Sequence, residues 1–347
     1  MTTTTSSPQA PAPVRPVASP TRRWTTAVRR TLLSPKYGPV TVTAVLFTAV
    51  FVAGGLRYTG FFSGQVLLNL FVDNAYLIVL AVGMTFVILT GGIDLSVGAV
   101  VALSTMIVAS LLQAGWAPAV VIPLILVLTS TLGLLVGLMI HVFKVQPFIA
   151  TLAAMFLARG LCYVISQSSI SITDPAFIAL ATTRIPLGGT LSITASVIIA
   201  ILVVAVAVWV LHKTRFGRTV YAIGGSEQSG MLMGLPVSRT KVLVYVISGF
   251  CSGLAGVLFT FYTLSGYPLT AIGTELDAIA AVVIGGTLLT GGYGFVLGSV
   301  LGVLVLGLIQ TIITFEGTLS SWWTKIFIGG LLLVFIILQR ALTARRR

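Results

Sequence analysis

The chain has 347 residues, of which 57% are hydrophobic and only 8% are charged, whereas soluble domains are about 25% charged. This composition excludes a soluble enzyme. Twenty Lys and Arg residues against seven Asp and Glu give a formal net charge of +13, which in a soluble protein would point to nucleic acid or another acidic partner.

The chain opens on a polar segment before any hydrophobic run. Residues 1–36 are rich in Thr, Ser, Pro and Ala, and they carry six basic residues and no acid. This composition predicts a disordered basic cytoplasmic tail, and we expect no cleaved signal peptide. A transmembrane domain is expected over 37–343, followed by a short basic tail over 344–347.

Ten hydrophobic runs follow the tail, each of a length that suits a membrane helix or a re-entrant segment. They predict an all-α polytopic membrane protein with about ten transmembrane helices. The eighth run is the shortest and is a candidate re-entrant segment. The runs lie at 39–57, 66–89, 95–113, 117–141, 148–166, 192–212, 242–265, 276–290, 294–314 and 323–340.

The basic residues fix the orientation of these helices. With the N-terminus inside, the inner segments hold sixteen Lys and Arg residues, and the outer segments hold only Arg57, Arg184 and Lys325. Cytoplasmic loops carry such an excess, so both termini are predicted to be cytoplasmic. The net charge of +13 therefore reflects the orientation of the chain in the membrane, and we expect no nucleic-acid partner.

The longest cytoplasmic segment spans 213–241 and is too short to form a domain. Ser226 suits the N-cap of a short helix, and Glu227 suits its first turn because a carboxylate there complements the helix dipole. Met231 and its apolar neighbours offer one apolar face. Two interpretations stay open, a solvated loop and a short helix presented to a cytoplasmic partner.

Polar residues interrupt the hydrophobic runs at few points, and these points are candidates for a solute pathway because buried polar groups in membranes usually face a cavity or a partner. A Gly-Gly break precedes Asp94 and offers backbone groups at membrane depth. The alternative is a tight turn in which Asp94 caps the next helix. Arg159, within the fifth run, is a candidate partner for one of the carboxylates. The candidate pathway residues are Asp73, Asn74, Asp94, Ser96, Glu275 and Asp277.

The Gly-Gly break also has a weak echo later in the chain. Residues 88–103 and 288–303 share Leu-Thr-Gly-Gly and a later Gly. We interpret this as a reused glycine-rich turn and not as a duplicated fold.

The chain lacks the residues that ATP binding, hydrolysis and metal binding usually require. None of the five Lys residues follows a Gly, so the chain has no P-loop for ATP, and it contains neither an HExxH nor a GxSxG motif. Cys162 and Cys251 lie in apolar runs, and His141 and His212 each end a separate run, which supports neither a disulfide scaffold nor a metal site. We expect a transporter and no enzyme, cofactor or metal.

Three long segments, 73–103, 221–256 and 275–302, resemble the ribose/galactose-type permeases of bacterial ABC sugar importers, in that family's order and spacing. The resemblance spans about 40–340. The segment 317–340 is similar to the galactofuranose permeases of that family, which work as a pair of related subunits. The basic tail is not part of the family pattern.

The resemblance implies a permease domain in the bacterial cytoplasmic membrane, a cytoplasmic ABC ATPase, a second permease subunit that is a paralogue or another copy, an extracytoplasmic sugar-binding protein and surrounding lipid. By the resemblance, Gly224, Gly225, Glu227 and Gly234 lie in or beside a coupling helix that docks on the ATPase. Ser226 and Met231 complete this candidate set.

The expected function is therefore translocation of a monosaccharide, of the galactofuranose type or another pentose or hexose. The alternative is an ion-coupled secondary transporter that uses Asp94 or Asp73 as the proton carrier.

Overall fold

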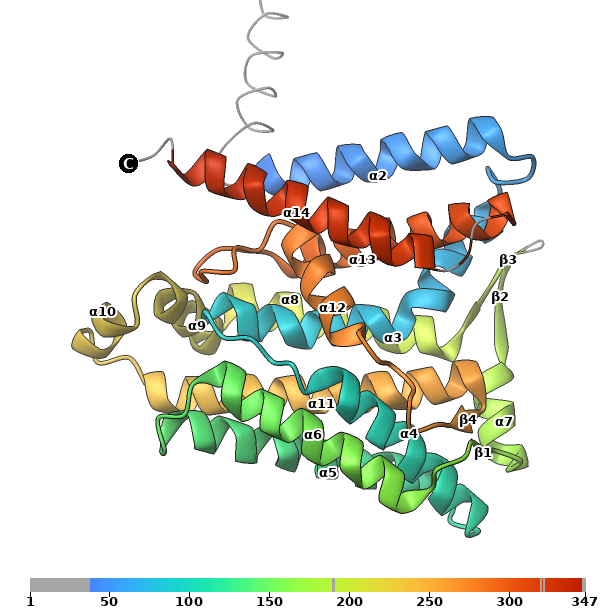
Figure 1. The fold of residues 1–347 in the computed structure, drawn as a ribbon, viewed down its shortest axis with the longest axis horizontal. Helices are drawn as coiled ribbons and strands as arrows, with labels where there is room; N and C mark the ends of the chain where they lie inside the picture. Colours follow the sequence, from blue (N-terminus) through green and yellow to red (C-terminus); the bar gives the residue numbers. More distant parts are fainter. Residues whose placement is uncertain (1–37, 189–190, 319, 321, 345–347) are drawn as a thin grey trace, which may run out of the picture.

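The computed structural model describes residues 38–188, 191–318, 320 and 322–344. The predicted N-terminal tail 1–36, and the predicted C-terminal tail 344–347 except for its first residue, lie outside the described residues. Helices make up most of the described chain (Figure 1). The helices are α2 (Gly38–Arg57), α3 (Gly64–Leu89), α4 (Val97–Gln113), α5 (Pro118–His141), α6 (Pro147–Ile165), α7 (Pro175–Thr182), α8 (Ala195–Lys213), α9 (Arg215–Gly225), α10 (Glu227–Leu232), α11 (Val237–Thr263), α12 (Thr274–Ile284), α13 (Val296–Glu316) and α14 (Trp322–Ala344).

The predicted all-α polytopic fold is confirmed, because each hydrophobic run contains a helix. Seven described helices are long and apolar enough to cross a membrane, namely α2, α3, α5, α6, α8, α11 and α13. The helices α4 and α12 are shorter, with 17 and 11 residues. The count of ten crossings stays a prediction.

The ends of the helices sort in agreement with the predicted topology. In Figure 1, α2 begins and α14 ends at the left, where α9 and α10 also lie. The elements that carry Arg57, Arg184 and Lys325 reach the opposite end. We call the end with α9 and α10 the cytoplasmic end, following the predicted topology, and the other end the outer end.

The centre of the bundle forms around α11, which packs against α3, α4 and α5. Glycines allow this close approach, since a Cβ placed on Gly249 of α11 would lie 3.1 Å from the Cα of Gly133 on α5. Small residues spaced by four bring membrane helices together where no hydrophobic force between them exists. The sequence places Gly137 and Gly253 one turn away from this pair.

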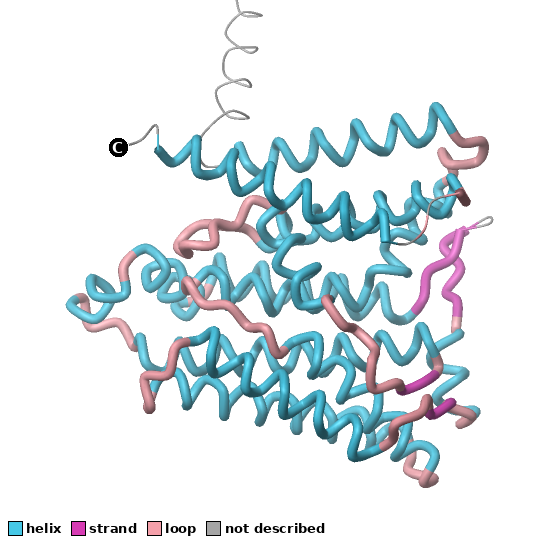
Figure 2. The backbone as a smooth tube through the Cα atoms, viewed as in Figure 1, coloured by secondary structure: helices cyan, strands magenta, loops and turns pink. Residues whose placement is uncertain are grey.

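Two non-helical segments interrupt the bundle, residues 90–96 before α4, which we call the first extended segment, and residues 267–273 before α12, which consist mostly of turns (Figure 2). In both cases the regular helical hydrogen bonding stops, although turn hydrogen bonds such as that from the Thr270 amide to the Tyr267 carbonyl oxygen at 3.0 Å remain, and the chain then continues as a short helix. Such broken crossings are tolerated at membrane depth only where protein or a water-filled cavity surrounds them. The predicted break at Gly91-Gly92 begins the first of these segments.

Short strands close the outer end. β1 (Ile170–Ser171) pairs antiparallel with β4 (Ser265–Gly266), and β2 (Arg184–Gly188) pairs with β3 (Leu191–Thr194). The first pair ties the chain that follows α6 to the chain that follows α11. It therefore fixes the point from which the segment 267–273 enters the bundle.

Candidate functional site

The first extended segment is held by the side chain of Asp94, which is buried. Its Oδ1 accepts hydrogen bonds from the Ser96 amide at 3.0 Å and the Ser96 hydroxyl at 2.6 Å. Its Oδ2 accepts a hydrogen bond from the Ser248 hydroxyl of α11 at 2.7 Å. Asp94 therefore holds the residue before α4 and fastens it to α11, but it does not cap the helix as the alternative interpretation predicts, because the N-cap residue of α4 is Ser96 and no described side chain accepts from the amides of its first turn.

Glycine at position 92 makes room for a tyrosine of α11. A Cβ built on Gly92 would lie 2.6 Å from the hydroxyl oxygen of Tyr245, whose side chain is buried. The Gly-Gly break thus allows the backbone of the first extended segment to lie directly on α11.

The turn segment 267–273 meets the first extended segment where α4 and α12 begin. Glu275, in the first turn of α12, accepts a hydrogen bond from the Gly273 amide at 3.2 Å. Its Oε2 lies so close to Gly98 of α4 that a Cβ at this position would overlap with it. The N-terminal turns of two short helices therefore converge, an arrangement that places backbone amides and a carboxylate at membrane depth.

Arg159 of α6 holds the approach to α12. Its guanidinium donates hydrogen bonds to the carbonyl oxygens of Pro268 at 2.6 Å and Thr270 at 2.8 Å. The predicted pairing with a carboxylate is not what the described residues show, because the partners of Arg159 among them are these backbone oxygens. An arginine can serve here since these two carbonyl oxygens lie in turns, outside the helical hydrogen-bond pattern.

The remaining candidate pathway residues make their contacts with other elements. Asp277 forms an ion pair with Lys325 of α14 at 2.6 Å. Asp73 is exposed on α3. Asn74 is buried and donates to the carbonyl oxygen of Leu70 at 2.9 Å, with its amide seated on Gly307 of α13. The structure thus brings Asp94, Ser96 and Glu275 to the start of α4 and does not gather all six candidates.

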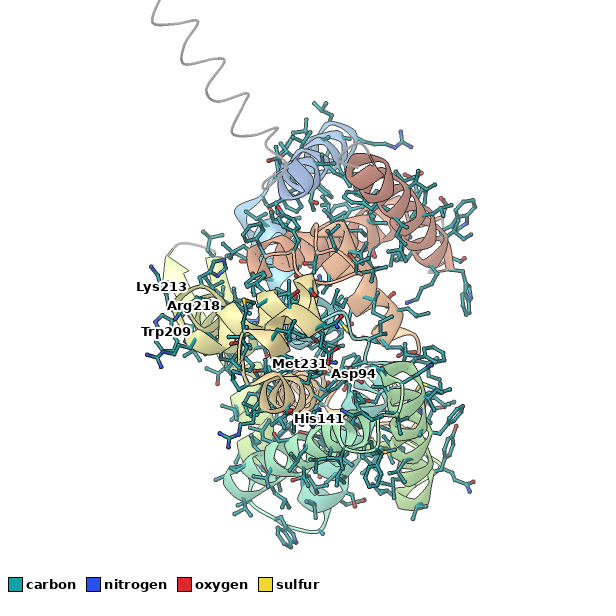
Figure 3. The ribbon with its side chains drawn as sticks, turned by 90° about the vertical axis from the view of Figure 1, so that its left-hand side faces the viewer. Asp94, His141, Trp209, Lys213, Arg218 and Met231 are labelled. Carbon is teal, nitrogen blue, oxygen red and sulfur yellow. The ribbon has the colours of Figure 1, made fainter. Side chains whose placement is uncertain are left out.

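The segment 213–241, which we call the coupling segment, contains the short helix that one of the two interpretations predicts. Ser226 caps α10 by accepting a hydrogen bond from the Ser229 amide at 3.2 Å, and Glu227 pairs with Lys241 of α11 at 2.6 Å. Met231 is half exposed and Leu232 is 84% exposed. Figure 3 looks onto this end and shows Met231 on the side that faces the viewer. The helix ends at Leu232, and Gly234 follows its C-cap residue with a φ of +72° that favours glycine.

The end of α9 meets two glycine-containing turns close to this helix, and we call the meeting point the glycine junction, formed by Gly91, Gly224, Gly291 and Gly292. The Gly292 amide donates a hydrogen bond to the carbonyl oxygen of Leu89 at 2.9 Å. A Cβ on Gly224 would overlap with both the Leu89 oxygen and the Gly292 nitrogen, and one on Gly291 would lie 2.8 Å from the Gly91 nitrogen. The two copies of the Thr-Gly-Gly echo are thus in contact.

Tyr221 of α9 adds a side-chain hydrogen bond beside the glycine junction. Its hydroxyl donates to the carbonyl oxygen of Gly294 at 2.8 Å. Burial raises the pKa of the Tyr221 phenol to about 12, so the proton that makes this hydrogen bond stays in place near neutral pH. The coupling segment is therefore attached to the turn before α13 through both backbone and side chain.

Sequence reasoning missed three features of this site. Ser248 and Tyr245 lie on α11 among apolar residues, with no local signal that they face Asp94. The contact between Gly224 and the two Thr-Gly-Gly turns was also missed. Its only trace in the sequence is the echo itself, whose copies share a glycine pair because each needs a close backbone approach.

A bundle with two broken crossings and a short exposed helix at its cytoplasmic end has the architecture of a multi-pass solute permease. Residues 66–336 match the family described as branched-chain amino acid transport system / permease component, and the chain belongs to this family. It is a multi-pass protein of the bacterial cytoplasmic membrane and a transporter component, not an enzyme.

Similar proteins cover nearly the same length. The inner membrane ABC transporter permease protein YjfF of Escherichia coli is 47% identical, over 88% of this chain and 92% of its own. The fructose import permease protein FruG of Bifidobacterium longum is 43% identical, over 92% and 98%. The ribose import permease protein RbsC of Haemophilus influenzae is 38% identical, over 82% and 88%.

These relatives confirm the expected membership in the ribose/galactose-type permeases of ABC sugar importers. No solved structure matches the chain.

Proposed function

We propose that the chain is the permease subunit of an ATP-driven importer and gives alternating access to a monosaccharide. The named relatives import ribose and fructose, and a further one, 33% identical, belongs to a D-allose transport system. Within this class, the similarity of 317–340 to galactofuranose permeases favours a galactofuranose-type sugar. An extracytoplasmic binding protein delivers the sugar, and a cytoplasmic ABC ATPase drives its release. A second permease subunit, a paralogue or another copy, completes the pathway.

The glycine junction is the observation that carries this proposal. It places the end of α9, next to the exposed α10, in backbone contact with the turns that end α3 and precede α13. A displacement of α10 by an ATPase is passed to these turns without any flexible side chain between them. The first turn leads into the extended segment before α4, and the second follows α12. Both broken crossings therefore receive the same movement.

The convergence of α4 and α12 is the proposed pathway element. Sugar hydroxyls both donate and accept hydrogen bonds, and the two helix N-termini with Glu275 offer amide donors and a carboxylate acceptor. Asp94 has a supporting part here, since both of its oxygens are already engaged by Ser96 and Ser248. Asp73 and Asn74 are proposed to border the pathway elsewhere along α3, and Asp277 beside the convergence on the side of α14.

The coupling segment is tested by the double substitution Glu227→Ala with Met231→Ala. The double variant loses the ion pair with Lys241 and an exposed apolar side chain. We expect sugar uptake to fall by about tenfold or more, which corresponds to a loss of about 1.4 kcal/mol in the free energy of docking to the ATPase. Uptake and ATP hydrolysis are measured in proteoliposomes that contain the complete importer. Hydrolysis should persist while its coupling to uptake is lost.

Phe143→Ala provides the matched control, because Phe143 is an exposed apolar residue of the same end outside the coupling segment. It should leave uptake unchanged. Normal uptake in the double variant would refute the coupling assignment. Uptake that collapses with an uncoupler and survives orthovanadate, at constant ATP, would instead favour the ion-coupled alternative.

A further inference from the structure

Three basic residues at the cytoplasmic end have no acidic partner in the described chain. We call Lys213, Arg215 and Arg218 the basic patch. All three side chains are exposed. All seven acidic residues lie within the described ranges, and the one at this end, Glu227, pairs with Lys241. The charge of the basic patch is therefore not neutralised within the described chain, and an anion from outside would complete it.

The basic patch continues a membrane-facing stripe of α8. Exposed apolar residues recur along one face of this helix and lead through Ile201 and Val206 to Trp209, which is 61% exposed, and then to Lys213 one turn later. Figure 3 shows Trp209, Lys213 and Arg218 grouped at one edge of the cytoplasmic end, apart from Met231. Tryptophan followed by lysine along an apolar face is typical of the boundary between hydrocarbon and headgroups.

An apolar crevice opens on the same stripe, deeper in the membrane. It has a volume of about 110 Å³ and lies between α3, α8 and α13, with Phe71, Ile201, Val204 and Val300 among its lining residues. Ile201 belongs to both the crevice and the exposed stripe. It precedes Lys213 by 12 residues, or about 18 Å of helix, and one leaflet of hydrocarbon is about 15 Å thick. The crevice is thus within reach of an acyl chain whose headgroup lies at the basic patch.

We propose that this face binds an anionic phospholipid of the cytoplasmic leaflet. The headgroup phosphate lies against Lys213, Arg215 and Arg218, and Trp209 lies beside the glycerol region. One acyl chain follows α8 to the crevice at Ile201. A protein partner is less suited to this face, because the basic patch ends an apolar stripe at membrane depth while the exposed residues of α10 lie elsewhere.

Trp209 itself reports on the occupant. In a variant with Trp24, Trp116, Trp322 and Trp323 changed to Phe, Trp209 is the remaining tryptophan. The full chain is placed alone in phosphatidylcholine nanodiscs, so that no partner chain contributes tryptophan fluorescence. Two series of preparations contain increasing mole fractions of either phosphatidylglycerol or phosphatidylcholine that is brominated near the headgroup end of the acyl chains. Quenching by the anionic lipid should reach half its maximum at about tenfold lower mole fraction, since each basic residue near an anionic surface adds to the attraction.

The variant Lys213→Gln, Arg215→Gln, Arg218→Gln should lose this preference and be quenched equally by both lipids. Lys144→Gln with Arg239→Gln is the matched control, because it removes cytoplasmic charge away from α8 and should keep the preference. Equal quenching by both lipids with the native basic patch would overturn the proposal. Absence of quenching by either lipid would also overturn it and would show that protein covers this face.

Discussion

Gly224→Ala is expected to abolish most sugar uptake while the neighbouring Gly225→Ala leaves uptake close to native. A methyl group at position 224 overlaps with the Leu89 carbonyl oxygen and the Gly292 amide nitrogen. Both are backbone atoms that cannot turn aside, so α9 must separate from the glycine junction. We expect uptake in proteoliposomes to fall by more than about tenfold, because overpacking of this kind costs about 1–3 kcal/mol.

Gly225 is a well-matched control. It is the last residue of the same helix, and a Cβ there meets nothing within 4 Å. Alanine also favours the helix over glycine by up to about 1 kcal/mol, so this variant should fold at least as well. Equal uptake by the two variants would contradict transmission through the glycine junction. Assembly with the ATPase, followed by affinity purification, separates lost transmission from lost folding.

Asp94→Ala is expected to destabilise the protein strongly. The substitution leaves the Ser96 amide, the Ser96 hydroxyl and the Ser248 hydroxyl without their acceptor in a buried site. A buried polar group that loses its partner costs about 1–3 kcal/mol, so we expect a loss of at least about 3 kcal/mol. Thermal unfolding in detergent, monitored by the monodisperse fraction, measures the effect.

Two further variants identify the role of Asp94. Ser248→Ala removes one of the three hydrogen bonds and should cost about 1 kcal/mol. Asp94→Asn keeps an acceptor for Ser96 and should retain ATP-driven uptake. Loss of uptake in Asp94→Asn at native thermal stability would contradict the supporting role and favour a proton carrier.

Local patterns in the sequence were sufficient to place most helices. The run at 117–141 coincides with α5, whose first residue is Pro118, a residue that suits the first turn of a helix. Ser226 caps α10 as its side chain predicts. The position of Asp94 after a glycine break likewise indicates a helix start. In each case the signal lies within a few residues of the feature.

Which of the candidate site residues lie close together in the structure could not be predicted from such local patterns. Asp73 and Asn74 are adjacent on one helix, so they point about 100° apart and cannot share a face. Asp73 is exposed and Asn74 packs against α13. The partners of Arg159 are carbonyl oxygens, and every residue type carries such an oxygen. Contacts made by backbone atoms leave no mark in the side-chain pattern beyond the glycines that permit them.

The clamp of Arg159 on the segment 267–273 limits how the subunit can change shape. Backbone outside a regular helix that meets hydrocarbon leaves amides and carbonyls without partners, at a cost of several kcal/mol for each group. This cost opposes a movement of the segment toward lipid, and we expect α6 to move together with it. In the proposed transport cycle, the surfaces that separate are then those lined by intact helices.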